Sequence, residues 1–290
     1  TLIIVYPDCS TARQFAAHVS TPKNREYPPP IRVPFIDAPA AARYDGEERF
    51  TRRKWGTRMH AWIKLLIFVV VTATLTRLIP FSEFFRNVYT LMHEMSHAAA
   101  TLLLSGKVMF IHLYADQSGV THSMIIAGWR SIPIALAGYT GAALFDWFLF
   151  YLLARGKEVS ALLIVAAIAG AALVLFVRNP YGMAWCAGFT VVTLLIFLFA
   201  ARWLRVTYAT LIAFICLLES IFSSFYILIL AAVEPAGAGD ATNLAHATPL
   251  PSIAWGLFFV LFSLWCAKNA TSHLFRSIFS RKSEKSPDIA

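Results

Sequence analysis

The sequence predicts an all-α polytopic membrane protein with six or seven transmembrane helices and a small β-hairpin. Of its 290 residues, 58% are hydrophobic and 14% are charged, and the mean hydropathy is +0.62. This leaves too little polar surface to cover a soluble globule of this size. Seven apolar runs each approach the ~20 residues that a helix needs to cross a bilayer. A segment of alternating residues after the second run indicates the hairpin.

The first 58 residues differ from the rest of the chain. Residues 21–34 are rich in proline, residues 42–58 are densely charged, and neither stretch has a helical or strand period. We expect this extension to be poorly ordered, and Met59 is our hypothesis for the native start. The predicted divisions are an extension at 1–58, a transmembrane domain at 59–275 and a basic cytoplasmic tail at 276–290.

Basic residues between the apolar runs predict the orientation in the membrane. If all seven runs cross, the turns at 155–157 and 202–205 lie on the same side as the basic tail, and loop 234–251, without Lys or Arg, lies on the other. The positive-inside rule then places the C-terminus in the cytoplasm. The basic stretch 43–58 would lie outside, against the rule, so either it is not native or one run does not cross.

We assign the net charge of +9 to contacts with an anionic lipid bilayer and expect no nucleic-acid partner. The predicted runs are 61–79, 84–104, 132–154, 159–177, 183–201, 206–232 and 252–270.

The second apolar run contains the sequence HEMSH at 93–97. In a helix, a spacing of four places His93 and His97 one turn apart on one face, where both imidazoles can bind one metal ion. Glu94 then lies beside the metal. This HExxH pattern is typical of two Zn²⁺ ligands with a carboxylate as general base. A packed core histidine is the ordinary alternative. However, ionisable groups in a lipid-compatible segment each cost about 2.5–3.5 kcal/mol on insertion scales, which disfavours a chance cluster.

The segment from Lys107 to Tyr114 alternates in the manner of a strand, and residues 116–119 supply turn chemistry before a second short strand. We expect this hairpin to be held against protein or at the membrane interface, because open sheet edges are not tolerated facing lipid. An edge strand can also pair with an extended peptide. We therefore assign substrate-binding roles to this strand, with an ordinary structural hairpin as the alternative. The substrate-binding residues expected on it are Phe110, His112 and Tyr114.

A zinc centre with an open position needs a third protein ligand, and the motif helix supplies two. Asp240 and His246, in the polar stretch before the last run, are the strongest candidates. Asp146 and Glu219, inside apolar runs, and Asp116, in the hairpin turn, follow them. Asp240 could instead cap a helical turn. The four cysteines lack CxxC pairing, so a thiolate zinc site is not expected.

Residues 59–273 resemble the membrane-embedded zinc metallopeptidases of the site-2 protease group, and most closely its small bacterial and plant branch without a PDZ domain. The resemblance implies zinc bound by His93 and His97, Glu94 as general base, and a multi-pass protein of a bacterial plasma membrane. In the best-known members the third ligand is an Asp in an LDG motif, which this chain lacks. The likeness to the small branch in GDATNLA favours Asp240. The segments that carry the resemblance are HEMSHAAATLLLSGKV, SGVT, AGYTGAALF, RNPYG and GDATNLA.

Our hypothesis is hydrolysis of a peptide bond in a membrane-protein or peptide substrate, within or beside the membrane. One alternative is a catalytically inactive scaffold or regulator of the same fold, which the missing LDG motif keeps open. Another is an ion-coupled transporter that uses Asp146, Glu219 and the histidine pair. The sequence has no inverted repeat that would favour a transporter.

Overall fold

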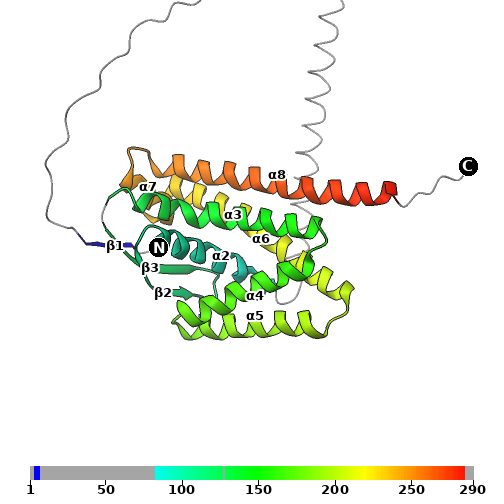
Figure 1. Cartoon of the computed structure of the whole chain (residues 1–290). Coiled ribbons are helices and arrows are strands. Elements are labelled where there is room, and N and C mark those ends of the chain that lie inside the picture. Colours follow the sequence, from blue (N-terminus) through cyan, green and yellow to red (C-terminus); the bar gives the residue numbers. More distant parts are fainter. Residues whose placement is uncertain (1–2, 7–81, 127, 285–290) are drawn as a thin grey trace, which may run out of the picture. The chain divides into compact units, whose positions relative to one another are not determined.

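The structure of the chain, a computed structural model, describes residues 3–6, 82–126 and 128–284. All of these residues belong to one compact unit. Figure 1 shows a bundle of helices with a small sheet at one end. The elements are β1 (Ile3–Tyr6), α2 (Ser82–Leu103), β2 (Lys107–Leu113), β3 (Gly119–Ile126), α3 (Ser131–Ala154), α4 (Glu158–Leu175), α5 (Pro180–Phe199), α6 (Arg202–Val233), the short 3-10 helix η1 (Pro235–Gly237), α7 (Gly239–Ala247) and α8 (Ser252–Glu284).

Five of the described helices are long and apolar enough to cross a membrane, namely α3, α4, α5, α6 and residues 252–272 of α8. They coincide with the last five predicted runs, so the predicted class of all-α polytopic membrane protein is confirmed. Helix α2 covers the run predicted at 84–104 and carries the polar HEMSH sequence. The first predicted run, 61–79, lies outside the described residues. Helix α8 continues to Glu284, so part of the predicted tail is helical.

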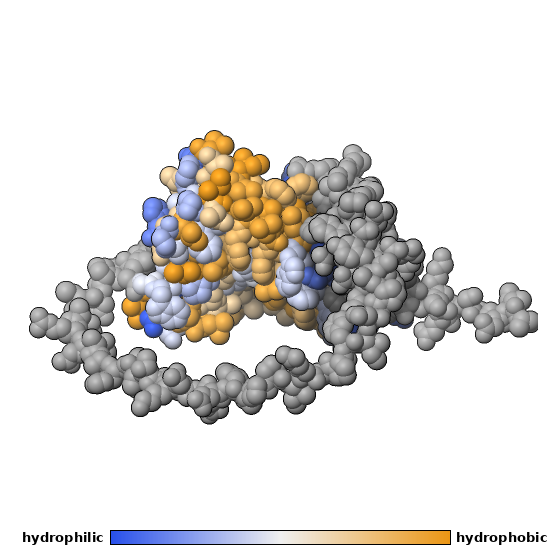
Figure 2. All heavy atoms as spheres, turned by 90° about the horizontal axis from the view of Figure 1, so that it is seen from above, coloured by the Kyte–Doolittle hydropathy of each residue, from blue (hydrophilic) through white to orange (hydrophobic). Residues whose placement is uncertain are grey.

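The site is built around α3, which packs against α2 on one side and α8 on the other (Figure 1). Helix α6 contacts all three, and α4 and α5 form an adjacent pair. Large apolar side chains that face outward lie on α5 and α8, among them Leu195, Leu198, Leu257 and Leu261. Apolar residues also cover most of the coloured surface in Figure 2. Such a surface is expected where helices contact lipid.

The predicted hairpin is present after the HEMSH helix. Strands β2 and β3 pair antiparallel with Ile111 opposite Thr121, and a bulge interrupts the ladder between Val108 and Phe110. Strand β1 adds to the other edge of β3 in parallel, with Ile3 opposite Ser123. Apart from β1, the extension at 1–58 that we expect to be poorly ordered lies outside the described residues. The apolar and largely β-branched sequence of β1, IIVY, is suited to pairing with an open strand edge.

The outer edge of β2 is closed by the turn between α4 and α5. The N–H of Ile111 donates to the carbonyl of Phe176 (2.8 Å), and the carbonyl of Ile111 accepts from the N–H of Arg178 (3.1 Å). The side-chain amide of Asn179 then acts as a further strand residue. It accepts from the N–H of Leu113 (3.1 Å) and donates to its carbonyl (2.6 Å). The expectation that the hairpin is held against protein is confirmed.

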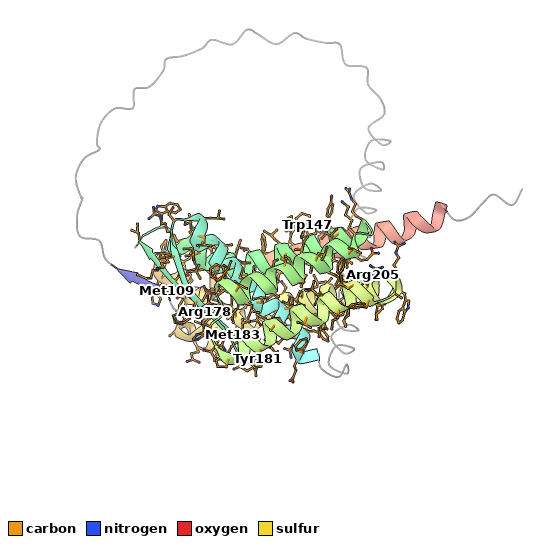
Figure 3. The ribbon with its side chains drawn as sticks, turned by 60° about the horizontal axis from the view of Figure 1, so that its bottom comes forward. Met109, Trp147, Arg178, Tyr181, Met183 and Arg205 are labelled. Carbon is orange, nitrogen blue, oxygen red and sulfur yellow. The ribbon has the colours of Figure 1, made fainter. Side chains whose placement is uncertain are left out.

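The same turn also ends α4. The guanidinium of Arg178 donates to the carbonyls of Val174 (3.1 Å) and Leu175 (2.8 Å), which have no partner further along the helix. Figure 3 shows Arg178 and Tyr181 where the start of α5 meets β2, whose Met109 is labelled nearby. The RNPYG segment therefore fixes the hairpin to the α4–α5 pair.

Replacing Asn179 by Asp should destabilise the protein, because it removes the donor to Leu113 and sets a carboxylate oxygen against that carbonyl. We expect a loss of about 1–3 kcal/mol, seen as a lower thermal unfolding temperature in detergent. Asn269→Asp is the control, since that amide bonds one carbonyl at the exposed surface of α8. Equal shifts in the two variants would contradict the role assigned to Asn179.

Candidate metal centre

Helix α2 presents two polar faces. His93 and His97 point toward α3 and α7, whereas Thr90, Glu94 and Thr101 face the hairpin. Successive residues of an α-helix are about 100° apart, so the adjacent positions of His93 and Glu94 place them on neighbouring faces. The HExxH spacing thereby directs two imidazoles to one side and the carboxylate to the next.

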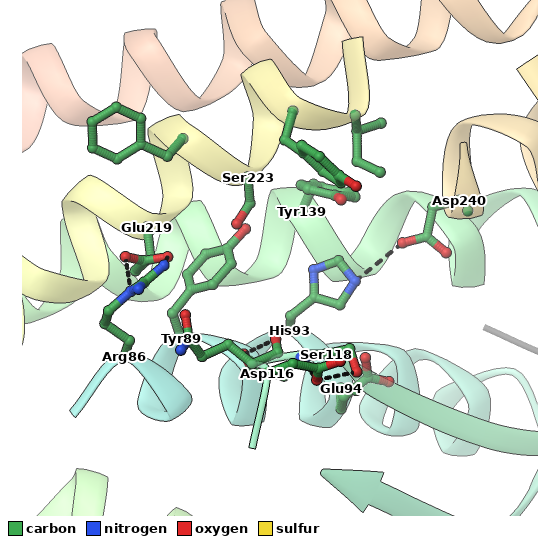
Figure 4. Close-up of a pocket in the computed structure, with 17 residues that line it drawn as sticks. Arg86, Tyr89, His93, Glu94, Asp116, Ser118, Tyr139, Glu219, Ser223 and Asp240 are labelled. Atoms are coloured by element: carbon green, nitrogen blue, oxygen red, sulfur yellow. Dashed lines mark hydrogen bonds and ion pairs between the residues drawn. The ribbon is translucent and has the colours of Figure 1, made fainter. Parts of the chain in front are cut away.

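Three ligand atoms from α2 and α7 form a nearly equilateral triangle. The Nε2 atoms of His93 and His97 lie 3.0 Å apart, and each is 3.1 Å from Oδ2 of Asp240. The side chains of His97 and Asp240 are only 1% and 2% exposed, and that of His93 is 12% exposed. Gly239, with φ of +50°, adopts the left-handed conformation that starts α7 and brings Asp240 to this position (Figure 4).

This donor set fits a zinc ion. Zn–N bonds of about 2.0–2.1 Å in a tetrahedron put neighbouring ligand atoms about 3.3 Å apart, close to the edges of this triangle. The Nδ1–H of His97 donates to the carbonyl of Ile134 (2.7 Å), so the neutral ring carries its lone pair on Nε2, toward the other ligand atoms. A cation would offset the repulsion between lone pairs gathered here. Two imidazoles and one carboxylate are a ligand set of catalytic zinc sites.

Helix α3 closes the space beside the triangle. A Cβ added to Gly138 would lie 2.6 Å from Nε2 of His93, so only glycine lets α3 come this close. The next residue, Tyr139, packs its ring edge-to-face on His93 (4.6 Å between centroids) and stacks on Phe259 of α8. Gly138 therefore allows α3 to pack closely against the HEMSH helix.

Glu94 lies next to the triangle without belonging to it. Its side chain is buried at 2% exposure, and its Oε2 accepts a hydrogen bond from the hydroxyl of Thr121 on β3 (2.6 Å). A Cβ on Gly119 would lie 2.8 Å from Oε1. The carboxylate is therefore held between α2 and the start of β3.

A cavity of about 590 Å³ opens onto this group. His93, Glu94 and Asp240 line one end, together with the hairpin turn at 116–119. Toward the other end, Arg86 forms an ion pair with Glu219, which joins α2 to α6. Figure 4 also shows Tyr89 and Ser223 pointing toward one another across the space between them. The cavity thus extends from the ligand triangle along the face of α2 that carries Arg86, Tyr89 and His93.

The other candidates for a third ligand lie away from the triangle. Asp146 is buried in α3, Glu219 is paired with Arg86, and His246 is exposed near the end of α7. Asp116 lies in the exposed hairpin turn, where hydrogen bonds from the hydroxyl and backbone N–H of Ser118 lower its pKa. Among the described residues, only Asp240 joins the two histidines.

The residues expected to bind substrate lie on the outer face of the hairpin. Phe110 stacks on His112 (4.6 Å) and packs on His122 (4.3 Å), while Ile111 on the opposite face is buried against the bundle. None of Phe110, His112 and Tyr114 lines the cavity. The bulge between Val108 and Phe110 breaks the alternation expected from the sequence. Val108 is buried with Ile111 and Leu113, whereas Met109 is exposed. The substrate-binding role of these three residues, Phe110, His112 and Tyr114, stays a prediction.

Sequence reasoning missed several residues of the cavity. Tyr89 and Arg86 precede His93 by four and seven residues, so helical spacing alone could have placed them on the same face. The contact of Thr121 with Glu94 had no local signal, because it depends on how β3 lies against α2.

Helices long and apolar enough to span a membrane surround a buried His–His–Asp group with a carboxylate alongside, and two His with one carboxylate are a ligand set of catalytic zinc sites. The family described as Peptidase M50B-like matches residues 62–269, and the chain belongs to this family of site-2 protease type. Its members are zinc metalloproteases. The resemblance found in the sequence motifs is thus confirmed. No curated protein and no solved structure was found to match the chain.

Replacing Gly138 by Ala should displace the imidazoles, because the added methyl group would overlap His93. We expect the purified variant to hold much less zinc than the wild type, measured by elemental mass spectrometry. Gly188→Ala is the matched control, since a Cβ there meets no atom within 4 Å. Full zinc occupancy in Gly138→Ala would contradict a metal site at this position.

Proposed function

We propose that this protein is a zinc-dependent endopeptidase that cleaves membrane-protein segments within or beside the bilayer. The observation that carries this proposal is the triangle of His93, His97 and Asp240 with Glu94 next to it, on a chain of a membrane metalloprotease family. In this proposal the three residues of the triangle hold the zinc. When bound, zinc supplies a Lewis acid that polarises the substrate carbonyl and activates water.

The general base in this proposal is Glu94. Thr121 occupies its Oε2 atom, which leaves Oε1 to take a proton from water and pass it to the departing amine. The residue lines the cavity at the same end as His93 and Asp240. Its burial excludes bulk water, which strengthens electrostatic interactions with the reacting groups.

The substrate strand needs a different place from the one expected from the sequence. Main-chain groups of Ile111 and Leu113 on β2 already bond residues 176–179, so a peptide could pair there only by displacing them. We place it along the edge of β3 opposite β2, at 119–122, next to residues 123–126 that pair with β1. Gly119 lines the cavity beside Glu94, and main-chain hydrogen bonds there would extend the peptide past the site.

Two observations favour this proposal over the alternatives. The inactive-scaffold alternative rested on a missing third ligand, and Asp240 lies within hydrogen-bond distance of both histidines. The transporter alternative used Glu219 as part of an ion path, whereas Glu219 forms an ion pair with Arg86. A bacterial plasma membrane stays our prediction for the location.

Replacing Glu94 by Gln should abolish cleavage while zinc remains bound. The amide keeps the size of the side chain but cannot accept the proton, and Glu94 is outside the ligand triangle. Cleavage of a model membrane substrate in detergent or vesicles, measured together with zinc content, tests this expectation. Wild-type cleavage by this variant would contradict the proposed role of Glu94.

Replacing Asp240 by Ala should lower zinc retention by roughly tenfold or more, because it removes one of three ligands. Asp146→Ala and Glu219→Ala should retain zinc, since both carboxylates lie outside the triangle. Metal content after dialysis against a weak chelator compares the three variants. Zinc loss in either control, with retention in Asp240→Ala, would identify a different third ligand.

A further inference from the structure

Three hydroxyl contacts join the hairpin to α2. Thr90 donates to the carbonyl of Gln117 in the turn (2.8 Å), Thr101 contacts Ser123 (3.1 Å), and Thr121 donates to Glu94 (2.6 Å). The first two contacts connect main chain or hydroxyl groups and hold the hairpin in place. The third involves the carboxylate proposed as general base.

The hydroxyl proton of Thr121 has one good acceptor. Thr121 is 1% exposed, so water does not compete for its hydroxyl group. The carboxylate Oε2 of Glu94 is 2.6 Å away, whereas the backbone carbonyl of the same residue is 3.2 Å away. A hydrogen bond to a charged acceptor is shorter and stronger than one to a neutral carbonyl. The hydroxyl of Thr121 therefore donates its hydrogen bond to Oε2.

Gly119 limits the position of the second carboxylate oxygen of Glu94, Oε1. The backbone of Gly119 approaches Oε1 so closely that a Cβ would come within 2.8 Å of it. Gly119 and Thr121 are two residues apart on β3, so the two contacts hold both oxygens from one strand. Without the hydroxyl, the carboxylate could rotate about its terminal bond, because such sp³–sp² torsions have broad minima.

We propose that Thr121 is a positioning residue that fixes the carboxylate of Glu94 with Oε1 directed into the site. This inference rests on the proposed function, in which Glu94 is the general base. It also gives β3 two roles in one segment, because residues 119–122 are the proposed place for the substrate strand. A peptide paired with this segment would be held in a fixed position relative to Oε1.

The test compares Thr121→Val, which removes the hydroxyl at constant shape, with Thr121→Ser, which keeps it. Thr121→Val should lower kcat by about 10–100-fold, as for other partners that orient a catalytic group, with KM and zinc content unchanged. Thr121→Ser should recover most of the lost kcat. The matched control is Ser123→Ala, which removes another buried hydroxyl from the same face of β3 but does not touch Glu94. It should cleave as the wild type does.

A second readout does not depend on activity. Thr121→Val should lower the thermal unfolding temperature in the wild-type background more than in a Glu94→Ala background, because the contact is absent from the latter. Equal shifts in both backgrounds, or wild-type kcat in Thr121→Val, would overturn the inference. If Glu94→Gln cleaves normally, the proposed function itself fails. If that variant is inactive and Thr121→Val is not, only the role of Thr121 is lost.

Discussion

The close approach of α3 to α2 at Gly138 is the contact on which the candidate centre depends. It brings the carbonyl of Ile134 to His97 and the ring of Tyr139 to His93, so one helix orients both imidazoles. Polar groups inside an apolar bundle are costly unless each finds a partner. Helix α3 supplies the polar partner of His97 and packs against the ring of His93, while Asp240 has the two histidines as its partners.

Unpaired backbone groups impose a second constraint. Open sheet edges are not tolerated facing lipid. Residues 176–178 and the side-chain amide of Asn179 close the edge of β2, and β1 pairs with residues 123–126 of β3. Because the main-chain groups of β2 are already bonded, a substrate strand has to pair with β3. The edge that keeps the hairpin stable is thus separate from the edge proposed to work with the site.

Local periodicity in the sequence predicted the apolar helices, the HEMSH helix and the hairpin. The helical spacing of His93 and His97 and the alternation in β2 are properties of adjacent residues, so the sequence displayed them directly. Asp240 was one of several candidates, because its contact with His93 spans 147 residues, and only the family resemblance favoured it over His246. The substrate-binding role expected of Phe110 rested on alternation, which separates two faces without showing which one packs on α2. Strand β1 pairs with a distant edge, which no local pattern indicates.

The separation of the ligands along the chain has a consequence for biosynthesis. The two histidines emerge from the ribosome long before Asp240, and α3 to α6 are made in between. An incomplete chain therefore lacks a full set of ligands for zinc. Under the proposed function, the chain could bind zinc with all three residues only after α7 has been made, so a nascent chain would not yet be able to cleave its neighbours.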